Sequence, residues 1–138
     1  MFACGPWSRA SHNDGTVRQH QRVASEDPVA SSFDVRVHDN VQLSLTMTNN
    51  TRHMLELLFP TGRTHDFVVL DEVGREVWRW SGGRMFTSVV RTKLMKSGNS
   101  VTYAAEWEPS LPNGNYVAVA TLHSSNFPVT TRVSFTLP

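Results

Sequence analysis

Cysteine is nearly absent from this chain of 138 residues, because Cys4 is the only one. A single thiol excludes an internal disulfide and a zinc site built from several thiolates. The fold must therefore be stabilised by a buried core. Long apolar runs are absent too, and without a stretch of about 18 apolar residues no transmembrane helix is predicted.

The chain also lacks an excess of positive or negative charge. The formal net charge is +1, and no block of like charges interrupts the chain. Nothing in this balance attracts nucleic acid or an anionic membrane, so neither is expected as a partner. Charged residues make up 18% and apolar residues 39%, which is typical of one soluble globular domain.

Catalytic and metal-binding signatures are missing as well. The chain has no nucleophile elbow, phosphate-binding loop or zinc-protease motif, and its six histidines have no metal-ligand spacing. We therefore predict no enzyme activity, no catalytic residues, no metal and no cofactor. His65 and Asp66 adjoin, but neighbours on a strand point to opposite faces and cannot act as base and orienting acid. Asp66 is instead expected to accept backbone or tryptophan N–H bonds where a strand begins.

Residues 1–31 show neither a helical nor a strand period, and we expect a flexible tail or linker there. Residues 32–138 then form the domain. Within the tail, Phe2-Ala3-Cys4-Gly5 resembles the end of a bacterial lipoprotein signal, although the apolar segment that should precede it is missing. Two interpretations stay open: a chance Ala-Cys pair in a cytoplasmic protein, or a truncated start that hides a lipid anchor at Cys4 and an envelope location. Membrane contact is expected only through that anchor.

Alternation of apolar and polar residues dominates the rest of the chain. Residues 41–48, VQLSLTMT, are the clearest case and predict a half-buried antiparallel strand. Similar patterns predict strands over 33–38, 53–59, 65–72, 75–80, 100–107, 115–123 and 130–137, with 66–80 as a hairpin. The fold class is therefore all-β, and a sandwich is favoured because each strand keeps one polar face.

The segment VWRWSGGRMF, residues 77–86, is rich in large side chains. Trp78 and Trp80 fall on one strand face, so we expect them to fill the core together, with Arg79 on the other face. A Ser-Gly-Gly turn follows, and Phe86 is expected to return to the core. These aromatics share faces with valine and leucine, so core packing is favoured over a base-stacking surface.

The chain resembles the BsuPI family of intracellular proteinase inhibitors. The resemblance rests on Leu57-Leu58-Phe59, the run from Thr61 to Val69 with Asp66 and Phe67, the run Val77-Trp78-Arg79-Trp80-Ser81, then Gly83, Met85, Phe86 and Thr87, and it continues through Tyr103, Trp107 and Gly114-Asn115-Tyr116. It implies an immunoglobulin-like antiparallel β-sandwich of about 7–9 strands. Asp66, Phe67, Trp78, Trp80 and Phe86 would be structural. Arg63 and His65 depart from the family, which tends to have glutamine and tyrosine there.

The resemblance also implies inhibition of a subtilisin-like serine protease by loop-mediated binding. Such an inhibitor presents a rigid loop to the protease cleft. Three loops are candidates: 81–85, 60–64 and 108–115. Their candidate contact residues are Ser81, Gly82, Gly83, Arg84, Met85, Arg63, Thr64, Pro109, Leu111 and Pro112. The alternative is a non-inhibitory immunoglobulin-like module for interaction or scaffolding, and the oligomeric state is left open.

Overall fold

The computed structural model describes residues 17–22 and 28–138, and strands are the only regular elements in these residues. In chain order they are β1 (Val17–Arg22), β2 (Val29–Val37), β3 (Val41–Asn49), β4 (Leu55–Phe59), β5 (His65–Leu70), β6 (Glu76–Arg79), β7 (Arg91–Met95), β8 (Ser100–Trp107), β9 (Gly114–Leu122) and β10 (Val129–Leu137). The predicted all-β class is confirmed, and the expected hairpin over 66–80 is the pair β5–β6.

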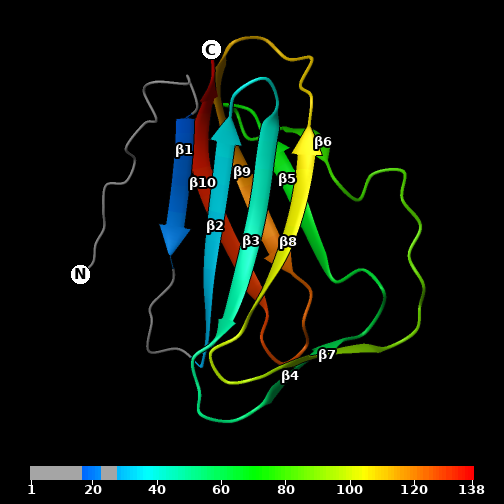
Figure 1. Cartoon of the computed structure of the whole chain (residues 1–138). Coiled ribbons are helices and arrows are strands. Elements are labelled where there is room, and N and C mark those ends of the chain that lie inside the picture. Colours follow the sequence, from blue (N-terminus) through cyan, green and yellow to red (C-terminus); the bar gives the residue numbers. More distant parts are fainter. Residues whose placement is uncertain (1–16, 23–27) are drawn as a thin grey trace.

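Two antiparallel sheets of four strands lie face to face (Figure 1). One has the order β1-β2-β3-β8 and the other β10-β9-β5-β6. The short pair β4–β7 crosses one end of this sandwich (Figure 1). The antiparallel sandwich is therefore confirmed, whereas its immunoglobulin-like connectivity stays a prediction.

The core lies between the two sheets and follows the alternation in the sequence. Every second residue of β3, from Val41 to Met47, is fully buried, and the residues between them face outward. Phe33 of β2 meets Phe67 of β5 across the layers, with ring centroids 5.9 Å apart. Full burial of one such side chain stabilises the fold by about 1.5–3 kcal/mol.

Two strands were not predicted from the sequence. β1 lies inside the range expected to be a tail, where it pairs with β2 from Val17–Val37 to Arg22–Ser32. β7 shows no alternation because four of its five residues are exposed and only Met95 is buried. A strand at the margin of a fold can be held by backbone hydrogen bonds alone, and such bonds leave no hydrophobic pattern.

A buried amide fastens the pair β4–β7 to the sandwich. The side chain of Asn49, at the end of β3, is fully buried. Its Nδ2 donates to the carbonyls of His53 and Met95, both at 2.8 Å. Its Oδ1 accepts from the amide and the hydroxyl of Thr51 at 2.9 and 2.7 Å. One side chain thus joins the start of β4, the end of β7 and the main sheet.

Replacing Asn49 by alanine is expected to lower the free energy of unfolding by about 2–4 kcal/mol, because several buried polar groups lose their partner. Urea unfolding followed by circular dichroism measures the change. Asn113→Ala, at an exposed loop position, is the matched control and should stay within about 0.5 kcal/mol of wild type. A loss below about 1 kcal/mol for Asn49→Ala would show that this amide does not secure the β4–β7 pair.

Candidate functional site

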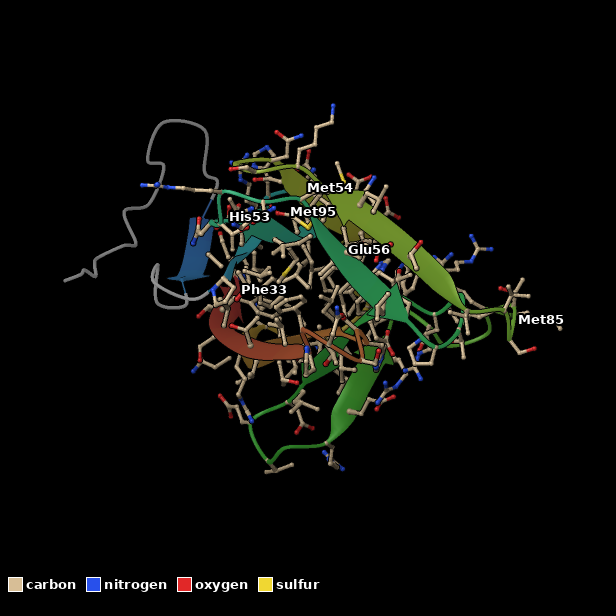
Figure 2. All side chains as sticks on the ribbon, turned by 90° about the horizontal axis from the view of Figure 1, so that it is seen from below. Phe33, His53, Met54, Glu56, Met85 and Met95 are labelled. Carbon is tan, nitrogen blue, oxygen red and sulfur yellow. The ribbon has the colours of Figure 1, made fainter. Side chains whose placement is uncertain are left out.

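The segment between β6 and β7 carries the most exposed large apolar side chain among the described residues. Met85 is 97% exposed, and Gly82, Gly83 and Arg84 before it are exposed as well. Figure 2 shows Met85 at the periphery of the molecule, far from Phe33 in the core. Met85 therefore projects into solvent from a segment that is neither helix nor strand and that also exposes Val89 and Val90.

Trp80 holds the residues on both sides of Met85. The Arg84 guanidinium lies 4.4 Å from the centre of the Trp80 ring, and its Nε donates to the Trp80 carbonyl at 2.8 Å. The ring of Phe86 lies on the same indole, with centroids 5.9 Å apart. A cation–π contact and an aromatic pair each contribute about 0.5–1.5 kcal/mol. Met85 is thus exposed while both its neighbours are held.

The start of the segment is fixed by Asp66. Ser81 donates to this carboxylate twice, from its amide at 3.0 Å and from its hydroxyl at 2.6 Å. The Arg84 amide then donates to the Ser81 carbonyl at 3.1 Å, which closes a turn. Gly83 sits in that turn with φ of 76°, a conformation that residues other than glycine rarely adopt. The direction in which the chain leaves β6 is therefore set by hydrogen bonds.

The far side of the segment is braced by the loop between β4 and β5. The Gly62 amide donates to the Thr87 carbonyl at 2.9 Å. A Cβ at position 62 would lie 2.5 Å from Thr87 Oγ1 and 3.2 Å from its backbone nitrogen, so any other residue there would require Thr87 to move. Sequence reasoning missed this role, and its only signal was a glycine between Thr61 and Arg63.

Asp66 is the centre of a polar network on the outer face of β5. Its carboxylate is 2% exposed and, besides Ser81, accepts hydrogen bonds from Arg63 and from Arg79, the latter at 2.9 Å. The Phe67 amide also donates to it at 2.9 Å. Burial acts to raise the pKa of Asp66, but the hydrogen bonds from Ser81, Arg63 and Arg79 outweigh it and lower the pKa to about 2. Asp66 thus accepts backbone N–H bonds, as expected, and ion pairs that the sequence did not reveal.

His65 points to the opposite face of β5, so the rejection of a His-Asp pair holds. Its ring stacks on Trp80 with centroids 4.4 Å apart and lies 4.6 Å from the ring of Tyr103. Its Nδ1 is 2.9 Å from the Thr64 hydroxyl. Burial lowers the pKa of His65 to about 4, so the ring is neutral at pH 7 and suited to stacking.

The tryptophans close an edge of the sandwich and do not fill its centre. Trp78 and Trp80 are half-buried and pack against the core at the edge of the two sheets. Trp78 stacks on Trp107 of β8 at 5.0 Å, so the two rings join β6 to β8 across the layers. Phe86 lies on Trp80 and does not return to the core, which corrects the expectation for that residue. Arg79 lies on the other face, as its contact with Asp66 requires.

The structure brings two of the three candidate loops together. Loop 60–64 contributes the Gly62 brace and points Arg63 inward to Asp66, and its residues from 61 to 64 are only half-exposed.

The third loop lies at the other end of β5, where Pro112 and the turn 71–75 line a shallow hollow of about 280 Å³. Leu111 packs against the core, Pro109 is half-buried, and the Tyr116 hydroxyl donates to the Pro112 carbonyl at 2.8 Å.

The family of intracellular proteinase inhibitors represented by BsuPI matches residues 29–127. This chain belongs to that family. The match begins at β2 and includes the whole segment around Met85. Membership implies a protease as partner and a role other than catalysis. None of the curated proteins compared with the chain matches it.

Similar solved structures are distant from this BsuPI-family chain. One is a protein described as ApaA from Bordetella pertussis, with 13% identity, a TM-score of 0.38, and coverage of 88% of this chain and 89% of that one. Another is a β-glucosidase from Erythrobacter marinus, with 13% identity, a TM-score of 0.36, and coverage of 85% and 14%. Likenesses this weak support no inference about fold or activity.

Metal and membrane features can be assessed for the described part of the chain. Residues 17–22 and 28–138 contain no group of three histidine, cysteine or acidic side chains placed to hold a metal ion. No helix in the same residues is long and apolar enough to cross a bilayer. Cys4, the candidate for lipidation, lies outside the described residues.

The Asp66 network predicts a loss of stability in acid. The folded-state pKa is lowered from 3.8 to about 2, so the stabilisation is complete above pH 4 and disappears as the pH falls toward 2. This loss amounts to about 2 kcal/mol. Urea unfolding at several pH values should show it in wild type and not in Asp66→Asn, which is also less stable at pH 7 because Arg63 and Arg79 lose their anion. Parallel curves for the two proteins below pH 4 would contradict this account. His65, whose pKa is also lowered, is present in both proteins, so its protonation cannot cause a difference between their curves.

Replacing Gly62 by alanine is expected to displace Thr87 and loosen the segment around Met85, because the new methyl group overlaps the Thr87 hydroxyl. Limited proteolysis should then cut residues 83–90 at least about 10-fold faster, since cleavage follows the population of the opened segment. Gly74→Ala is the control: nothing lies within 4 Å of its Cβ position, and the strain that its positive φ of 88° causes would act in the β5–β6 turn and not at Thr87. Equal cleavage rates in the two variants would argue against the brace.

Proposed function

We propose that this protein inhibits a subtilisin-like serine protease by inserting residues 83–87 into the active-site cleft, with Met85 in the primary specificity pocket. Membership of the inhibitor family supports a protease as the partner. The exposed segment supports the manner of binding, because an inhibitory loop must be accessible at its centre and ordered on both sides.

The observation that carries this proposal is the pairing of exposure with restraint at Met85. Its side chain is 97% exposed, whereas Arg84 and Phe86 both contact Trp80. The other two loops lack this combination: residues 61–64 are half-buried, and Leu111 packs against the core. Pre-ordering reduces the conformational entropy lost on binding, by about 0.5–1.5 kcal/mol for each side chain already fixed.

The scissile bond in this arrangement is Met85–Phe86. Attack by the protease serine on the Met85 carbonyl carbon would release the amino group of Phe86. That amine stays in place, because the Phe86 ring contacts Trp80 and the carbonyl of the next residue, Thr87, accepts a hydrogen bond from the Gly62 amide. A leaving group held at the site has a high effective concentration and can reform the bond. Cleavage would then be slow, and the complex long-lived.

Met85→Asp is expected to weaken inhibition about 30-fold or more, because a charge does not enter an apolar pocket and buried central residues carry about 2 kcal/mol or more of binding energy. The measurement is the inhibition constant against subtilisin with a chromogenic peptide substrate. Met85→Leu, which keeps volume and polarity, should remain within about 3-fold of wild type. The matched control is Val73→Asp, since Val73 is 74% exposed in the β5–β6 turn at the opposite end.

Mass spectrometry of the protein after long incubation with subtilisin should find slow cleavage between Met85 and Phe86. Inhibition by Met85→Asp equal to wild type, or cleavage confined to another loop, would refute the assignment of this segment. No inhibition by micromolar wild-type protein would instead favour the alternative, a non-inhibitory interaction module.

A further inference from the structure

The four methionines in the described residues differ widely in exposure. Met47 and Met95 are 0% and 2% exposed, whereas Met54 is 54% and Met85 97% exposed. Figure 2 shows the same difference between Met85, at the periphery, and Met95, within the molecule. Oxidation of a methionine converts a flexible apolar side chain into a polar one. Of these four side chains, Met54 and Met85 are the two that a dissolved oxidant can reach in the folded protein.

The oxidation of a methionine by hydrogen peroxide is a simple oxygen transfer. The thioether sulfur takes one oxygen atom from the peroxide, so a sulfur–oxygen bond forms, the oxygen–oxygen bond breaks, and the other oxygen leaves as water. The sulfur is oxidised by two electrons and the peroxide is reduced by the same two. The product, methionine sulfoxide, is returned to the thioether by two reductases, one for each sulfoxide epimer.

The fold does not depend on the Met85 side chain. Because 97% of this side chain is exposed, a sulfoxide there stays in water and displaces no neighbour. The contacts that hold the segment belong to other residues: Arg84 and Phe86 contact Trp80, and Thr87 accepts the hydrogen bond from Gly62. Oxidation therefore changes the polarity of the exposed residue and leaves its framework intact.

We propose that Met85 is a site of oxidative modification by peroxide, and that its conversion to the sulfoxide switches off inhibition of the protease. This inference rests on the proposed function, in which Met85 enters the specificity pocket. Water solvates the sulfoxide oxygen in the free protein, whereas binding would bury this oxygen in an apolar pocket without a hydrogen-bond donor. The modification thus opposes binding and not folding. The same reasoning makes it reversible, because the oxidised protein stays folded while a reductase acts on it.

Met54 is an internal control for the position of the effect. It lies directly before β4 and is exposed, so peroxide reaches it too, but it is not part of the segment that would enter the cleft. Met47 and Met95 react only when the fold opens. Oxidation at Met54 should therefore accompany oxidation at Met85 without affecting inhibition.

The test oxidises the protein before it meets the protease. Every protein carries Cys4→Ser, because the thiol also reacts with peroxide. After treatment with hydrogen peroxide, catalase removes the remaining oxidant, and mass spectrometry of peptides measures the sulfoxide at each methionine. The inhibition constant against subtilisin is then measured with a chromogenic peptide substrate. The result is expressed as the ratio of the constants after and before oxidation of the same protein.

The expected ratio is about 10- to 100-fold for the parent Cys4→Ser protein and for Met54→Leu, because a polar group is buried without a partner in both. For Met85→Leu the ratio should stay below about 3-fold. Met1 and Met54 are still oxidised in that variant, so the comparison isolates Met85. Circular dichroism and the unfolding midpoint should not change on oxidation. Treatment with both sulfoxide reductases should restore the inhibition constant of the parent protein.

The outcomes separate this inference from the proposed function. If Met85 is fully converted and the parent protein still inhibits, while Met85→Asp does not, the oxidative switch is wrong and the inserted segment stands. If Met85→Leu loses inhibition on oxidation as the parent does, another group carries the effect and the switch at Met85 is refuted. Conversion of Met54 with none at Met85 would refute the accessibility on which the inference rests. If the untreated parent protein does not inhibit, the proposed function falls and the inference falls with it.

Discussion

The carboxylate of Asp66 is the contact on which the exposed segment depends. It binds Arg63 from the loop before β5, Arg79 from β6 and Ser81 from the start of the segment, so three separate parts of the chain share one anion. A buried carboxylate is tolerated only when its charge is compensated, and here two guanidinium groups and several N–H and O–H donors do so. The same bonds that satisfy Asp66 also fix the direction in which the chain leaves the sheet.

The residue that supports the exposed segment, Trp80, is different from the residue that the segment exposes, Met85. Trp80 stacks on His65 toward the interior, and it also meets Arg84 and Phe86 on the exposed side. The indole is therefore a link between the sandwich and the segment that projects from it. A domain without disulfides needs such links, because a long surface segment otherwise loses too much conformational entropy on binding. The family motif around the tryptophans is consistent with this structural role.

Alternation in the sequence predicted eight of the strands, because most of them turn every second side chain toward the core. It could not predict β7, whose residues are mostly exposed, or β1, whose sequence has no hydrophobic period. The candidate site, too, could be predicted from the sequence only in part. The sequence offered three loops and could not rank them, because the ranking depends on which side chains stay exposed in three dimensions: Met85 does, whereas Leu111 packs against the core. The resemblance supplied the family, whereas the position of Met85 came only from the three-dimensional arrangement.

The exposure of Met85 has a consequence for how this protein can evolve. Its side chain contributes little to the fold, since almost none of its surface is covered, and its neighbours are held by residues that lie elsewhere. A substitution at this one position therefore costs little stability. In the proposed complex, selection can change the side chain that enters the protease while Asp66, Trp80 and Gly62 remain as they are. With binding through Met85 as proposed, the framework thus leaves the choice of target free to change.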